Sequence, residues 1–146
     1  MTMIKRLFLL AALSAGAGLV QAAPNIQEQL DGAAAKCRID GAMGDIQAGI
    51  VQRNHGEKSP QYKAAVETSF KDAKACVDRE KLAIKPNVKG AIEATPDLKP
   101  EIMDAYGKWL SYMDWMATPH EISAESPESR NFTDASNRLK AAIELR

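Results

Sequence analysis

Apolar residues recur every three or four positions in four stretches of the chain, the spacing that gathers them on one face of an α-helix. The stretches cover residues 25–53, 59–85 and 97–117 and a last segment that begins at Ser126. Glycine, asparagine and proline separate them, and these residues favour turns. The pattern therefore predicts an all-α fold, an antiparallel bundle of about four helices.

The stretch 59–85 carries signals for both ends of a helix. Ser59 can cap the first turn with its hydroxyl, and Pro60 follows at the first helical position, where a missing N–H costs nothing. Pro86 and Asn87 follow the last periodic residue and predict the end of the helix. Its predicted buried stripe consists of Tyr62, Val66, Phe70, Ala73, Val77 and Ile84.

The chain has two cysteines, and the helix lengths predict that they lie level with each other across a hairpin. Residues 54–58 form the predicted turn; Cys37 lies 16 residues before Arg53, and Cys76 lies 16 residues after Pro60. Because each residue rises ~1.5 Å in both arms, equal counts give equal height. We therefore expect a Cys37–Cys76 disulfide that staples the first helical hairpin, and the absence of a Cys-x-x-Cys pair argues against a redox role.

One face of the first helix carries small residues around Cys37. A disulfide needs Cα atoms about 5.5–6 Å apart, closer than the usual spacing of helix axes, so small side chains on this face suit the bridge. A helix broken at Asp40 and Gly41 is the alternative. The predicted facing stripe consists of Ile26, Leu30, Ala33, Cys37, Gly41, Gly44, Ala48 and Val51.

The same helix carries a second apolar stripe, roughly 200° away from Cys37. It consists of Ile39, Met43, Ile46 and Ile50. Either another helix covers this stripe, which would make the first helix central in the bundle, or the stripe is an exposed surface for a partner or for self-association.

The stretch 97–117 has the most regular apolar spacing. Asp97 is its predicted cap, and Thr118 and Pro119 predict its end. The residues at 86–100 are expected to form a connection that crosses one end of the hairpin. The predicted buried stripe consists of Leu98, Ile102, Tyr106, Trp109, Met113 and Met116.

Trp115 falls on the polar side of that helix, which is unusual for so large an apolar side chain. Either the returning loop from Pro119 to Ser126 folds over it, or Trp115 and Tyr112 contact a ligand or a partner.

The last helix is expected to begin as the second one does, with Ser126 as the cap and Pro127 at the first helical position. Its buried side is predicted to consist of Phe132, Ala135, Leu139, Ala142 and Ile143.

Residues 1–22 have the composition of a secretory signal peptide. Lys5 and Arg6 precede an apolar run of 14 residues, shorter than the ~20 that a membrane span needs, and the segment ends in a small-residue cleavage site at Ala22. Cleavage there leaves one helical domain, 23–146, with no membrane span, in the periplasm or the medium of a bacterium. An uncleaved membrane anchor is the alternative.

Charge and composition exclude several functions. Removal of the signal peptide leaves 17 basic residues against 19 acidic ones, with no basic patch to bind nucleic-acid phosphates. The two histidines, His55 and His120, belong to no nucleophile–base pattern, and no cofactor motif is present. We therefore expect no cofactor and no enzymatic activity; a site assembled from dispersed carboxylates is the alternative.

One small group of residues offers metal chemistry. Met113 and Met116 are three residues apart on one helix face, and His120 follows four residues later. Thioethers and an imidazole are suitable ligands for Cu(I). The structural alternative is that both methionines are part of the core.

The sequence thus predicts a non-enzymatic interaction module with an accessory, chaperone-like or inhibitor role and a protein partner in the cell envelope. Its candidate surface is Ile39, Met43, Ile46 and Ile50, with Tyr112 and Trp115 as a second contact. A copper or small-ligand binder that uses Met113, Met116 and His120 is the second hypothesis. An exposed stripe would favour the first, a pocket of ~300 Å³ the second, and shifted carboxylates in a cleft an enzyme.

Overall fold

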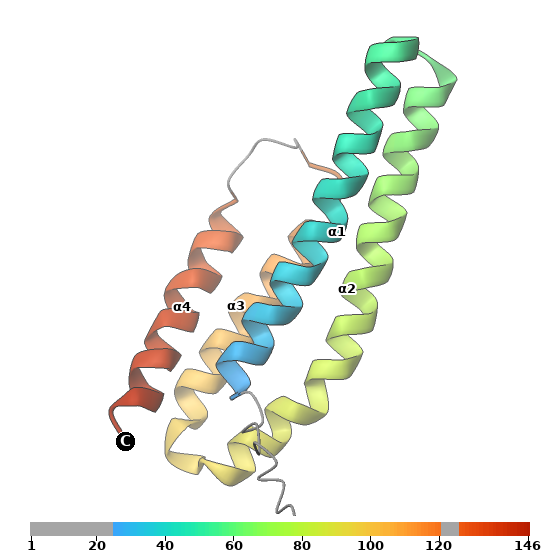
Figure 1. Cartoon of the computed structure of the whole chain (residues 1–146). Coiled ribbons are helices and arrows are strands. Elements are labelled where there is room, and N and C mark those ends of the chain that lie inside the picture. The colour runs from blue at the N-terminus through green and yellow to red at the C-terminus, as the bar shows by residue number, and fades with distance from the viewer. Residues whose placement is uncertain (1–24, 121–125) are drawn as a thin grey trace, which may run out of the picture.

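The computed structural model describes residues 25–120 and 126–146, so the predicted signal peptide lies outside the described residues. The described chain forms four α-helices, one short 3-10 helix and no strand, which confirms the predicted all-α class (Figure 1). The elements are α1 Ile26–His55, α2 Pro60–Ala94, η1 Pro96–Leu98, α3 Lys99–Met116 and α4 Pro127–Glu144.

Side-chain caps begin three of the helices. The Asn25 side chain accepts a hydrogen bond from the Glu28 N–H at 3.0 Å, and the Glu28 carboxylate accepts one from the Asn25 N–H in return. The Ser59 and Ser126 hydroxyls cap α2 and α4, each followed by its proline, as the sequence predicts. Gly56, in the turn after α1, has a φ of 85°, a positive value that favours glycine.

The α1–α2 hairpin is closely packed and stapled as predicted. The disulfide joins Cys37 to Cys76, whose Cα atoms lie 5.5 Å apart, and both residues are buried. Farther along, Gly44 lies against Ser69, and a β-carbon on Gly44 would come within 3.1 Å of the Ser69 Cα. The alternative of a break at Asp40 is wrong: α1 is continuous there, because its small residues pack directly against α2.

The predicted end of α2 at Pro86 is also wrong, because the helix continues to Ala94. Proline removes one backbone donor, but the carbonyl that loses its partner belongs to Leu82, which is exposed and can bind water. Ile84 and Val88 are buried on either side of the proline, so packing maintains the helix. Figure 1 shows α2 bending in this region, so that its last turns cross the lower end of the hairpin towards α3.

Helix α3 supplies the centre of the core. Ile102, Trp109 and Met113 are completely buried, and the predicted stripe faces the other helices. Asp97 is not the cap, contrary to the prediction: it lies in η1, α3 begins two residues later without a side-chain cap, and the Asp97 carboxylate accepts a hydrogen bond from Arg146 at 3.1 Å.

Helix α4 packs mainly on α3 and closes the core with residues from its predicted buried side. Phe132, Ala135 and Leu139 are buried, and Ala142 and Ile143 pack at the edge. Because α3 and α4 have 18 residues each whereas α1 has 30 and α2 has 35, the shorter pair covers only part of the hairpin. The tip of the hairpin projects beyond α3 and α4 (Figure 1). No helix in the described ranges has the length and apolarity that a bilayer crossing requires.

Candidate functional site

The second apolar stripe of α1 is exposed. The exposed fraction is 59% for Ile39, 61% for Met43, 58% for Ile46 and 37% for Ile50. The alternative in which another helix covers this stripe is therefore wrong for the described helices. The stripe lies on the face of α1 opposite the one that packs on α2, and no described helix packs on that face.

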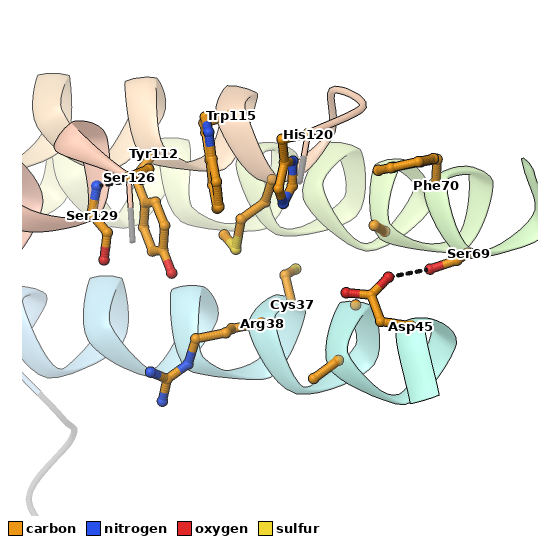
Figure 2. A pocket seen from close by; sticks show the side chains of 14 residues that line it. Cys37, Arg38, Asp45, Ser69, Phe70, Tyr112, Trp115, His120, Ser126 and Ser129 are labelled. Atoms are coloured by element: carbon orange, nitrogen blue, oxygen red, sulfur yellow. Dashed lines mark hydrogen bonds between the residues drawn. The ribbon is translucent and has the colours of Figure 1, made fainter. Parts of the chain in front are cut away.

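A cavity of about 330 Å³ lies between the helices, beside the disulfide (Figure 2). It receives side chains from all four α-helices and from His120, which follows α3. Its lining residues are Cys37, Arg38, Gly41, Ala42, Asp45, Ser69, Phe70, Ala73, Tyr112, Trp115, Met116, His120, Ser126 and Ser129.

One side of the cavity is aromatic. The His120 ring stacks on the Trp115 indole, with ring centres 3.7 Å apart and planes 27° apart. Phe70 meets the other side of His120 edge-on at 6.0 Å, and Tyr112 lies 6.1 Å from Trp115 with nearly parallel rings. His120 belongs to the segment that, in one of the two sequence alternatives, folds over Trp115, and residues 121–125 of that segment lie outside the described residues.

Tyr112 and Trp115 differ in how accessible they are. Tyr112 is buried and also stacks on Phe132 at 6.0 Å, so its ring belongs mainly to the core. Trp115 is half-buried and presents its indole to the cavity. Neither residue belongs to the exposed stripe of α1, and the two therefore form a second, concave contact rather than an extension of that surface.

Polar groups lie at both ends of the cavity. The Ser69 hydroxyl donates to the Asp45 carboxylate at 3.1 Å at one end. At the other end, the hydroxyls of Tyr112 and Ser129 point towards α1, which carries Arg38 (Figure 2). Sequence reasoning missed this polar set, because its members come from different helices and share no spacing along the chain.

The three proposed copper ligands do not share one environment. Met116 and His120 both line the cavity, whereas Met113 is completely buried and is not among the lining residues. The His120 Nδ1 atom lies 2.6 Å from the Thr118 carbonyl oxygen. Within residues 25–120 and 126–146, no three His, Cys, Asp or Glu side chains cluster to hold a metal ion. The copper hypothesis stays a prediction that rests on the sequence.

The most perturbed carboxylate lies away from the cavity. The hydrogen bond from Lys36 to Glu80, 2.6 Å long, lowers the pKa of Glu80 against the opposing effect of burial. This pair joins α1 to α2 on the surface of the hairpin, and Glu80 does not line the cavity. Its lowered pKa reflects an ion pair between helices and supports no assignment of a catalytic acid.

Comparison of the chain with protein family models, with curated proteins and with solved structures finds no match. The functional argument therefore depends on the two surfaces described above, the exposed stripe and the cavity.

Proposed function

We propose that this protein is an exported, non-enzymatic interaction module that binds a partner through the stripe of Ile39, Met43, Ile46 and Ile50. The observation that carries the proposal is the exposure of these four large side chains in one row on the hairpin. Single exposed apolar residues are ordinary on protein surfaces, but a contiguous row of them is typical of an interaction site.

The spacing of the stripe favours a helical partner. Its members follow one another at intervals of four, three and four residues, which is the seam that one helix presents to another in a coiled coil. The row lies on one continuous helix that packs on α2. An amphipathic helix of a cell-envelope protein matches this surface.

The compartment we propose is the periplasm or the medium. The predicted signal peptide at 1–22 directs export, and a disulfide within a helical hairpin persists in an oxidising environment. Cleavage after Ala22 removes Lys5 and Arg6, and the mature chain carries a net charge of about −2.

The proposal is tested by capture of envelope proteins on the immobilised mature protein, whose mass also reports cleavage after Ala22. Ile46→Asp places a charge in the middle of the stripe and should weaken capture by about thirtyfold or more, the loss expected at an interface hot spot. Leu82→Asp is the matched control, because Leu82 is an exposed leucine on α2 outside the stripe. Equal capture by the wild type and by Ile46→Asp would reject the stripe as the binding surface.

A further inference from the structure

We infer that the cavity beside the disulfide is a binding site for a small planar aromatic carboxylate. This inference does not depend on the proposed function, because the cavity and the exposed stripe are separate surfaces. The cavity volume of about 330 Å³ is that of a small-molecule site, and its walls combine apolar and aromatic side chains with a few polar groups.

The aromatic wall selects a flat ligand. Trp115 and His120 stand face to face and their edges border the cavity, while Tyr112 and Phe70 extend the same wall on either side (Figure 2). Met116 also lines the cavity, and methionine sulfur packs well against aromatic rings. A planar ring placed in this space would contact aromatic edges and a thioether, which is favourable for an aromatic ligand and poor for a branched aliphatic one.

The end of the cavity near α4 selects an anion. Arg38 is exposed, and no ion pair to an acidic side chain is found for it among the described residues, although Lys36, two residues away, pairs with Glu80. The hydroxyls of Tyr112 and Ser129 point towards α1, whereas the Arg38 guanidinium is turned away from the cavity (Figure 2), so this exposed side chain has to turn inwards to meet a bound anion. Arginine and two hydroxyl groups are a good set for a carboxylate, which accepts paired hydrogen bonds from a guanidinium.

The opposite end of the cavity is less suited to a charged group. Asp45 lies seven residues from Arg38 on α1, about 10 Å along the helix axis, and already accepts a hydrogen bond from Ser69. An aromatic carboxylate oriented with its acid group at Arg38 therefore keeps its negative charge away from Asp45. A cationic ligand would have to use Asp45 and is the competing outcome of the test.

The test compares three naphthalene probes of nearly equal shape. They are 2-naphthoate, the neutral 2-naphthylmethanol and the cation 2-naphthylmethylammonium, each titrated by calorimetry into the full mature protein. The naphthoate should bind at least about tenfold more tightly than the other two, the effect of one charge-assisted hydrogen bond. In the nitrogen–proton spectrum, the indole signal of Trp115 should shift, whereas that of the buried Trp109 should not.

Matched variants separate recognition of the carboxylate from nonspecific binding of the naphthalene ring. Arg38→Gln should weaken naphthoate binding by about tenfold and leave binding of the neutral probe unchanged. Arg53→Gln, which removes an exposed arginine elsewhere on α1, should change neither. The inference is overturned if naphthoate does not bind, if the cationic or neutral probe binds as well, or if Arg38→Gln binds naphthoate like the wild type.

Discussion

Gly44 shows how a single side chain sets the distance between two helices. A β-carbon at this position would lie 2.9 Å from the Ser69 Cβ and 3.1 Å from its Cα, so the two backbones could not stay as close as they are. Ser69 is buried and bonded to Asp45, which restricts how far it can move. The close packing of α1 on α2 thus requires a residue without a β-carbon at position 44, even though glycine has a low helix propensity.

We predict opposite stability effects for two glycine-to-alanine substitutions in α1. Gly44→Ala should destabilise the protein by about 1–3 kcal/mol, because overpacking against Ser69 outweighs the better helix propensity of alanine. Gly32→Ala should stabilise it by about 0.5–1 kcal/mol, because no atom lies within 4 Å of the added methyl group. Urea unfolding of both variants measures the difference, and a stabilised Gly44→Ala would contradict the close packing.

At the scale of elements, where a helix continues or ends depends more on the burial of its side chains than on local capping and proline signals. The caps at Ser59 and Ser126 act as predicted, because a hydroxyl and the N–H two or three residues later are neighbours in any helix start. Pro86 does not end α2, because Ile84 and Val88 are buried on both sides of it. Asp97 does not cap α3, because η1 delays the helix start and leaves the carboxylate near Arg146.

The disulfide is predicted to stabilise the hairpin chiefly by restricting the unfolded chain. It closes a loop with a sequence separation of 39 residues, and the chain-entropy model gives about 4 kcal/mol for a loop of ~40 residues. The Cys37→Ala/Cys76→Ala double variant should lose up to that amount in urea unfolding. Reduced wild-type protein is the control and should lose a similar amount; a loss below ~1 kcal/mol in both would contradict this account.

At the scale of the whole molecule, both surfaces of interest depend on how the four helices are arranged. The hairpin projects beyond α3 and α4 (Figure 1), and the exposed stripe of α1 lies on its face opposite α2. The cavity lies where the upper part of α3 and the start of α4 meet the hairpin, near the disulfide.

We predict that the hairpin tip opens more readily than the rest of the protein. Between its two arms, the buried residues near the tip are small ones such as Ala48 and Ser69, whereas Ile102, Trp109 and Met113 are completely buried in α3. Native-state hydrogen exchange should therefore show lower opening free energies for the amides of 46–54 and 60–68 than for those of α3. Equal values in both regions would mean that the tip and the core unfold together.

The sequence by itself determined the helical class, the starts of the helices at Ser59 and Ser126 and the pairing of Cys37 with Cys76, because these depend on local capping and on the fixed rise of a helix. Only the tertiary structure decided that α2 passes through Pro86, that Ile46 and its neighbours are exposed, and that Arg38, Tyr112 and Ser129 border one cavity. These features depend on which distant segments pack together and where each ends, and no spacing along a single helix contains that information.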